Sequence, residues 1–142
     1  MSYTVTVSAQ SPNPLIANIQ MGDHNFVIDE TGLEKGEDKR PDPYDYILSA
    51  LGACTVVTLH MYAARKGWPL ERAEVSLTHE RIYVKDCGSC EENEAKLNQV
   101  TKTLKLTGDL TEEQRQRLED ISSRCPVQKT LEAGISVKTI LV

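Results

Sequence analysis

Hydrophobic and polar residues alternate along the first 30 residues of the chain, which is the pattern of strands that bury one face. Met21, Gly22 and Asp23 interrupt this alternation with a turn signal. The pattern predicts three consecutive strands: one near the N-terminus with Tyr3, Val5 and Val7, one at residues 15–21, and one at residues 24–30. Residues 31–43 then form a polar connection rich in glycine, proline and charge, and a connection of this length is more often functional than accidental.

A long apolar run follows, and its boundaries are typical of a helix. Asp42 and Pro43 favour a helix start, and Gly67 favours its end. Residues 46–64 within this helix are nearly long enough to span a bilayer. The run contains hydroxyl side chains and His60, however, and it stands alone among strand-like segments. We therefore predict a buried helix of a soluble protein and no membrane association.

Three further segments have the alternating pattern of strands. They are expected at residues 70–84, 97–108 and 135–142. In the second of these segments, a bulge is one way to bring the apolar residues to a single face.

Two helices are predicted between the last two strands. Thr111 and Gln114 have the spacing of a capping box at the start of the first helix. Pro126 favours the first position of the second helix, and Gly134 favours its end. Because strands and helices do not alternate regularly, the order of elements predicts an α+β fold with mostly antiparallel sheets. We assign it to a single domain that spans residues 1–142.

Composition and charge exclude some classes of function. The 142-residue chain has a net charge of −5 and no basic patch, so we predict no nucleic-acid partner. It contains one Phe and one Trp, and burial against a second subunit would compensate for a core so poor in large aromatic side chains. The N-terminus lacks the basic and apolar regions of a signal peptide, and four cysteines without such a signal suit a reducing compartment. We therefore expect a cytoplasmic protein.

Cys54 lies in the stretch LSALGACTVV of the long helix. Helical spacing places it on one stripe with Ile47, Leu51, Thr58 and Met61. A buried, inert thiol is one explanation of this position. The small neighbours Gly52 and Ala53 leave space beside the thiol, and either a second helix or a substrate could occupy that space.

Cys125 stands at the start of the last predicted helix, immediately before Pro126 and close to Arg124 and Lys129. Exposed backbone N–H groups and positive charges both favour a thiolate. The local sequence therefore makes Cys125 the better activated of these two cysteines, and a structural loop cysteine is the alternative.

Cys87 and Cys90 form a C-x-x-C pair in an acidic stretch of the chain. His79 is a candidate third ligand for zinc, but the spacing offers no fourth ligand. The acidic neighbours disfavour thiolates, which argues against a thioredoxin-like centre. A surface pair that forms a disulfide or binds metal weakly is the remaining interpretation, and we assign no metal site. The sequence contains no phosphate loop or dinucleotide fingerprint, and we expect no cofactor.

Two long stretches of the chain together resemble the OsmC/Ohr family of thiol peroxidases. The resemblance lies in LGAC and YAARKGWPLE within residues 42–71, and in GDLTEEQRQRL and CPVQKTL within residues 108–139. It implies an OsmC-like fold in which two chains intertwine as a homodimer. The long helix of each chain is central, mostly antiparallel sheets flank it, and the active sites lie at the interface. The acidic C-x-x-C stretch resembles an OsmC-like branch distinct from the best-studied groups.

The resemblance also implies a reaction. Cys54 is the peroxidatic thiolate that attacks an organic hydroperoxide, and Cys125 resolves the resulting sulfenic acid to a disulfide. A dithiol, either a small molecule or of the lipoyl type, then reduces the disulfide.

The family pattern includes an arginine near the reactive thiol and a glutamate that holds this arginine. In this sequence Tyr44 stands where the glutamate is expected. Arg40 is the nearest candidate for the arginine, and Asp45 is positioned to orient it. Because of Tyr44, we retain a second hypothesis: a dimeric binding or redox-regulatory protein on the same scaffold, without efficient peroxidase activity.

Overall fold

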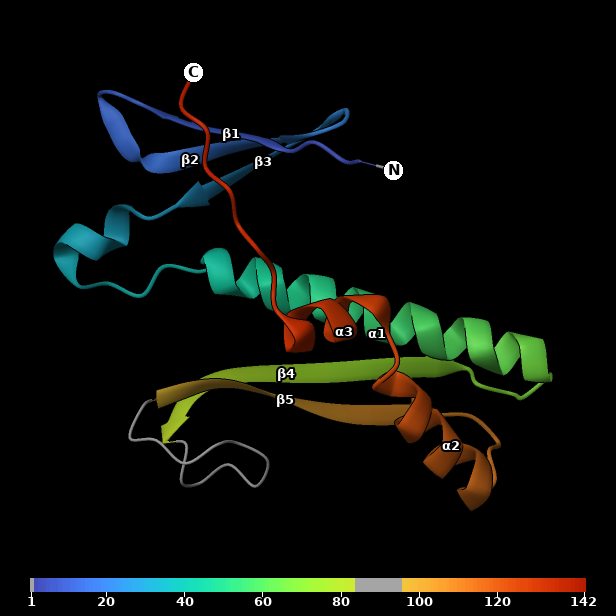
Figure 1. The fold of residues 1–142 in the computed structure, drawn as a ribbon. Helices are drawn as coiled ribbons and strands as arrows, with labels where there is room; N and C mark the ends of the chain where they lie inside the picture. The colour runs from blue at the N-terminus through green and yellow to red at the C-terminus, as the bar shows by residue number, and fades with distance from the viewer. Residues whose placement is uncertain (1, 84–95) are drawn as a thin grey trace. The chain divides into compact units, whose positions relative to one another are not determined.

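The computed structural model describes residues 2–83 and 96–142 (Figure 1), so the Cys87–Cys90 pair lies outside the described residues. The order of elements is β1 (Thr6–Gln10), β2 (Asn13–Met21), β3 (His24–Asp29), η1 (Thr31–Lys35), α1 (Pro43–Lys66), β4 (Arg72–Tyr83), β5 (Lys96–Thr107), α2 (Glu112–Ser122) and α3 (Pro126–Ala133). The chain divides into two compact units, Met1–Ile47 and Leu48–Val142, and each is described by itself. The assignment of residues 1–142 to a single domain stays a prediction.

The first unit contains an antiparallel sheet in the order β1-β2-β3, as the alternating pattern predicts. Met21 pairs with His24, so Gly22 and Asp23 form the tight turn between β2 and β3. Gly22 has a φ of +56°, a backbone conformation that glycine adopts without a steric penalty. Part of the polar connection that follows forms the short helix η1, which ends at Gly36.

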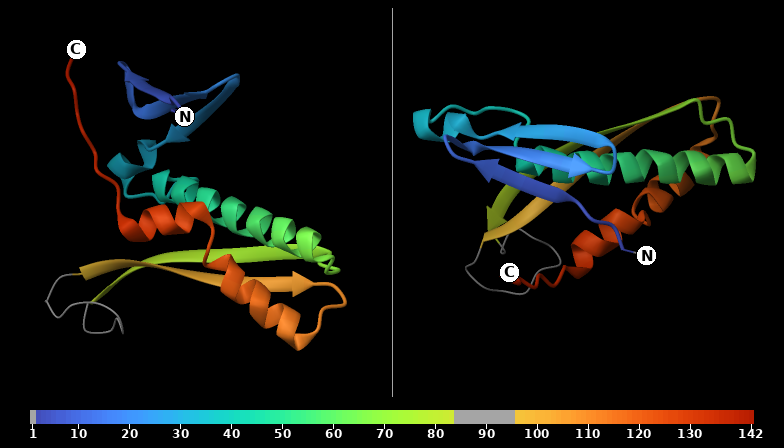
Figure 2. Two further views of the ribbon diagram at one scale, coloured as in Figure 1. Left: turned by 45° about the vertical axis from the view of Figure 1, so that its right-hand side comes forward. Right: turned by 90° about the horizontal axis from the view of Figure 1, so that it is seen from above.

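The second unit is built on a hairpin of β4 and β5, with α1 along one face (Figures 1 and 2). The register runs without interruption from the pair Arg72–Thr107 to the pair Tyr83–Lys96, so the bulge considered from the sequence is wrong. Continuous pairing brings Leu104 directly opposite Val75, and directly opposite residues share a face of the sheet.

Gly52 of α1 lies close to this sheet. A Cβ atom at this position would lie 2.9 Å from Cδ1 of Leu77 and 3.4 Å from Cγ1 of Val75. The missing side chain therefore lets the helix backbone approach the sheet. The sequence left a second helix or a substrate open for this space; at Gly52 the structure places side chains of strand β4 there instead.

The buried face of α1 differs from the predicted stripe. The buried residues are Leu51, Gly52, Thr55, Leu59 and Ala63. Ile47 and Met61, at the two ends of the predicted stripe, are 46% and 68% exposed. The sheet contacts the side of α1 that carries Gly52, about one residue or 100° around the helix from the predicted centre. Cys54 consequently lies half-buried at the edge of the buried face.

Helix α2 completes the core of this unit. Leu118 and Ile121 of α2 form a buried cluster with Leu59 and Ala63 of α1. Thr111 caps α2: its side chain accepts a hydrogen bond from the backbone N–H of Gln114, and the reciprocal bond is also present, which confirms the predicted capping box. Helix α3 begins at Pro126 and ends at Ala133, as predicted.

The predicted C-terminal strand at residues 135–142 is wrong, because the chain beyond α3 forms neither strand nor helix. Ile135, Val137 and Ile140 are 65%, 84% and 71% exposed. A strand needs a neighbouring strand to satisfy its backbone N–H and C=O groups. Among the residues that the structure describes, no strand pairs with this segment.

By length and hydropathy, α1 meets the requirements of a membrane-spanning helix, which is weak support for a membrane location because core helices of soluble proteins meet them too. In the second unit α1 packs on the β4–β5 hairpin through Gly52 and contributes Leu59 and Ala63 to the core. These contacts hold one face of α1 against the rest of the second unit.

Candidate active site

Cys125 occupies the N-cap position of α3, where the chain turns from an extended conformation into the helix. It is fully buried, and its Sγ accepts a hydrogen bond from the backbone N–H of Gln128 at 3.3 Å. Pro126 follows as the first helical residue and pre-sets the backbone angle that the helix needs. The thiol therefore faces the unsatisfied N–H groups of a helix N-terminus, which favour a negative charge.

Thr55 connects Cys125 to the long helix. Its side chain is fully buried, and its Oγ1 lies 2.8 Å from the carbonyl oxygen of Leu51 and 3.8 Å from Sγ of Cys125. The hydroxyl has one proton, so it donates to one of these two acceptors at a time. Thr55 is the neighbour of Cys54 in the sequence, so this contact brings the start of α3 to the segment of α1 that carries the second cysteine.

Lys102 of β5 adds a positive charge to these groups. It lies directly opposite Leu77, on the face of the hairpin that packs against α1. Its Nζ donates hydrogen bonds to Oγ1 of Thr55 at 3.2 Å and to the carbonyl oxygen of Ser122 at 2.9 Å.

The electrostatics of Lys102 link it to both cysteines. Burial lowers the pKa of the Lys102 ammonium below its ordinary value. Negative charge at Cys125, at Cys54 and at Glu132 opposes this decrease, in that order of size. Both thiols are free, and Thr55 lies between Cys125 and the Lys102 ammonium group, at 3.8 Å from Sγ of Cys125 and 3.2 Å from Nζ of Lys102.

Lys102 and Thr55 are residues that the sequence-based prediction missed. A signal for Lys102 exists in the sequence, because it occupies an inward position of an alternating strand between Val100 and Leu104. A lysine at a strand position where the alternation predicts an apolar residue indicates a specific partner or a function. Thr55 carries no comparable signal, since a hydroxyl in a helix commonly bonds to its own backbone.

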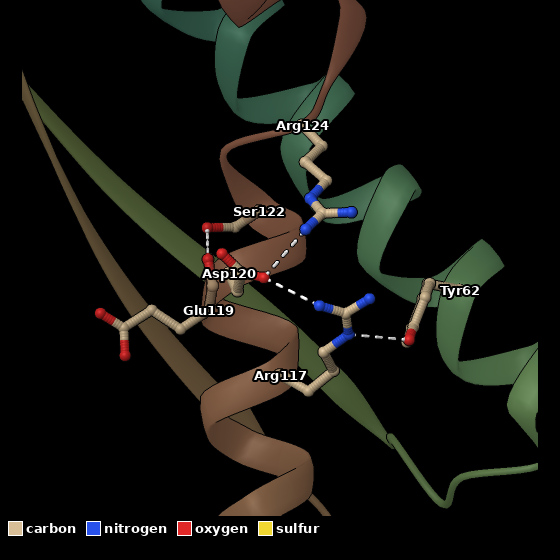
Figure 3. A network of polar contacts seen from close by, with 6 residues as sticks. All are labelled: Tyr62, Arg117, Glu119, Asp120, Ser122 and Arg124. Carbon is tan, nitrogen blue, oxygen red and sulfur yellow. Dashed lines mark hydrogen bonds and ion pairs between the residues drawn. The ribbon is translucent and has the colours of Figure 1, made fainter.

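The charge of Arg124, expected to favour a thiolate at Cys125, is paired with a carboxylate instead (Figure 3). Arg124 and Arg117 both form ion pairs with Asp120, at 3.1 and 2.9 Å, and Nε of Arg117 also donates a hydrogen bond to the Tyr62 hydroxyl at 3.1 Å. The hydrogen bond from Arg117 lowers the pKa of Tyr62. Because Asp120 offsets its charge, Arg124 is a weaker source of positive charge for Cys125 than the sequence indicated.

Arg40 and Asp45 form an ion pair, as their spacing suggested. Asp45 is held at the first turn of α1: its Oδ2 accepts from the backbone N–H of Asp42 at 2.8 Å, and its own N–H donates to Asp42 Oδ1 at 2.9 Å. The hydrogen bond from Asp42, and then that from Arg40, hold the pKa of Asp45 below its ordinary value. This pair belongs to the first unit and the cysteines belong to the second, so a joint role stays a prediction.

Within residues 2–83 and 96–142, no group of three or more His, Cys, Asp or Glu side chains is arranged to hold a metal ion. His79, a ligand candidate in the sequence, has its Nε2 2.9 Å from Oδ1 of Asn98 on the neighbouring strand.

The helix on a two-stranded hairpin, with one free cysteine on that helix and another at a helix N-cap, defines an α+β protein with two candidate reactive thiols. Residues 36–140 match the family described as OsmC-like protein, and the chain belongs to this family.

Solved structures share the fold at low sequence identity. An OsmC-like protein from Mycoplasma pneumoniae is 16% identical, with a TM-score of 0.69 and coverage of 93% of this chain and 88% of that one. The organic hydroperoxide resistance protein OsmC of Legionella pneumophila is 17% identical, with a TM-score of 0.62 and coverage of 89% and 88%. The organic hydroperoxide resistance protein OhrB of Bacillus subtilis is 17% identical, with a TM-score of 0.60 and coverage of 91% and 89%. No curated protein matches the chain in sequence.

Proposed function

We propose that this protein is a thiol-dependent peroxidase that reduces organic hydroperoxides and so contributes to resistance against oxidative stress. Membership of the OsmC-like family and the likeness to organic hydroperoxide resistance proteins support a redox or peroxide-resistance role. The observation that carries the proposal is that Cys54 and Cys125 are free thiols, and that Thr55, the sequence neighbour of Cys54, lies 3.8 Å from Sγ of Cys125 and accepts a hydrogen bond from Lys102 at 3.2 Å. A cysteine pair beside a cation is the arrangement that thiol-based peroxide chemistry needs.

In this reaction the thiolate of Cys54 attacks the terminal oxygen of the hydroperoxide. The O–O bond breaks, Cys54 becomes a sulfenic acid, and the leaving alkoxide takes up a proton to give an alcohol. The thiol of Cys125 then attacks the sulfur of the sulfenic acid, forming a disulfide and releasing water. A dithiol, small or of the lipoyl type, reduces this disulfide and becomes oxidised to its own disulfide. The sequence of steps requires no metal or cofactor.

We also propose that the protein works as an intertwined homodimer in the cytoplasm. Large apolar side chains on the outer face of α1 support this, because Val57 and Met61 are 55% and 68% exposed. Apolar residues of the C-terminal segment are exposed as well, including Val137 at 84%. Exposed apolar patches of this kind are typical of surfaces that bind another protein. A cytoplasmic location suits free thiols that a dithiol must keep reduced.

The test is consumption of cumene hydroperoxide by the purified protein with dihydrolipoamide as the reductant. We expect Cys54→Ser to abolish turnover, and Cys125→Ser to accumulate a sulfenic acid that a dimedone probe detects. The double variant Cys87→Ser/Cys90→Ser removes two other thiols and serves as the control, which we expect to retain turnover. If turnover persists unchanged in Cys54→Ser, the proposal is wrong.

A second candidate function is a binding or redox-regulatory protein on the same scaffold. The observation that favours it is Tyr44 at the position of the family's glutamate, together with an Arg40 side chain that is 59% exposed. The rate of Cys54 oxidation separates the two candidates. Fast, selective oxidation by an organic hydroperoxide compared with hydrogen peroxide supports the peroxidase, whereas slow oxidation by both supports the regulatory protein.

A further inference from the structure

Lys102 lies on a largely apolar face of the hairpin, where the desolvation of an ammonium group costs free energy. Its neighbours on the inner face of the hairpin are Leu77, directly opposite, and Val100 and Leu104 two residues away along β5. An ammonium group on such a face needs partners that compensate for the water it loses. A leucine or methionine would fill this position without the desolvation cost. The lysine therefore indicates a structural or chemical role.

The partners of Lys102 are neutral oxygens. Its Nζ donates to the hydroxyl of Thr55 and to the carbonyl of Ser122, which uses two of its three N–H groups. Among residues 2–83 and 96–142, the ion pairs of the protein do not include Lys102. Its positive charge is therefore not neutralised by a carboxylate in direct contact within the described part of the chain.

The cysteines supply the missing negative charge when they ionise. Thr55, which accepts from Nζ, also lies 3.8 Å from Sγ of Cys125 and is the sequence neighbour of Cys54. Of the charges that act on the Lys102 ammonium, those of Cys125 and Cys54 have larger effects on its pKa than that of Glu132. Within the described residues, these three groups, from α1 and from α3 with its N-cap, are the charges that act on the Lys102 ammonium, and α2 contributes the Ser122 carbonyl.

We propose that Lys102 is the activating cation of the two-cysteine site: its ammonium group, held by Thr55 and Ser122, stabilises the thiolates of Cys54 and Cys125. The inference rests on the proposed function, and it assigns to Lys102 the task that the sequence assigned to Arg40 with Asp45. The cation reaches the site from strand β5 rather than from the polar connection before α1. Lys102 is oriented by a hydroxyl and a carbonyl, so its position does not require the family's glutamate.

The experiment measures how fast each cysteine of the full chain reacts with iodoacetamide between pH 5 and pH 10, with each alkylated peptide quantified by mass spectrometry. Only the thiolate reacts, so the rate at a given pH reports the fraction of thiolate. A nearby opposite charge favours the ionised form of a thiol. Lys102 is half-buried, and we expect Lys102→Met to slow alkylation of Cys54 about tenfold at pH 7.

Two further variants separate charge from structure. Lys102→Arg retains the charge, and we expect alkylation within about threefold of the wild-type rate. Lys105→Met removes a lysine from the opposite, exposed face of β5, where Lys105 pairs with Glu74, and we expect no change in the rate. Circular dichroism shows whether each variant is folded. A folded Lys102→Met protein whose Cys54 reacts within twofold of wild type at every pH overturns the inference.

The outcomes for Lys102 and for the proposed function are distinguishable, because alkylation requires no peroxidase activity. If the protein consumes no hydroperoxide but Lys102→Met slows alkylation, the peroxidase proposal fails and Lys102 remains the activating cation. If turnover depends on Cys54 but alkylation does not respond to Lys102→Met, the peroxidase proposal stands and the role of Lys102 is refuted.

Discussion

The hydrogen bond between Lys102 and Thr55 is suited to a double-mutant cycle. Oγ1 of Thr55 is buried, accepts from Nζ of Lys102 at 3.2 Å and lies 2.8 Å from the carbonyl oxygen of Leu51. Thr55→Val keeps the shape of the side chain and removes this oxygen. Lys102→Met removes the ammonium group and keeps an unbranched apolar stem.

The magnitude follows from the partners that remain. A hydrogen bond to a charged group contributes about 1.5–3 kcal/mol, and Lys102 is half-buried, so water replaces part of what Thr55→Val removes. We expect this substitution to lower the free energy of unfolding by about 1–2 kcal/mol in the wild-type background. In the Lys102→Met background no buried charge loses a partner, so we expect the same substitution to change it by less than about 0.5 kcal/mol.

Urea denaturation of the four proteins, followed by circular dichroism, measures the coupling energy. We expect a coupling energy of about 1 kcal/mol or more, because Thr55→Val lowers the free energy of unfolding more when Lys102 is present than when it is methionine. If the two substitutions are additive within about 0.5 kcal/mol, the contact does not stabilise the ammonium group and the reasoning is refuted. Thr55→Ser, which keeps the hydroxyl, is the control that separates loss of the hydrogen bond from loss of packing.

Two further predictions concern stability. Gly108 has a φ of +147°, and a Cβ atom there would overlap the carbonyl oxygen of Pro69, so we expect Gly108→Ala to lower the free energy of unfolding in urea by about 3 kcal/mol. Gly67→Ala, at φ +70° with open space around it, is the matched control with an expected loss of about 1 kcal/mol; equal losses would contradict the steric argument. The pKa of Asp45 is held below its ordinary value of 3.8, chiefly by the hydrogen bond from the N–H of Asp42. The carboxylate therefore contributes fully to the stability of the fold above about pH 4, and this stabilisation is lost as the pH falls through the lowered pKa. We therefore expect Asp45→Asn to reduce the acid-induced loss of thermal stability, and an unchanged dependence of Tm on pH would show that this pairing contributes nothing.

The sequence predicted the elements whose ends depend on local chemistry. The turn at Gly22, the capping box at Thr111 and the helix start at Pro126 all occur where the residue types require them. Each of these signals acts within a few residues, through backbone angles and hydrogen bonds between near neighbours in the chain. Such interactions do not depend on the rest of the fold, so one sequence is enough to recognise them.

Predictions that depend on a distant partner were less reliable. The stripe through Cys54 failed because helical spacing defines several possible faces, and contact between Gly52 and Leu77 decides which face is buried. The strand at residues 135–142 failed because alternation shows only that a segment can pair, not that a partner strand is present.

The sequence by itself determined the helices, the hairpins and the family, and with them the two cysteines as candidate reactive groups. Only the tertiary structure showed that Lys102 and Cys125 share Thr55 as a neighbour. Lys102 lies far from Cys54 and Cys125 along the chain, and the uninterrupted register of β4 and β5 brings it to the inner face opposite α1. The reason is that charge stabilisation depends on distance in space, and distances between remote segments are set by sheet register and helix packing.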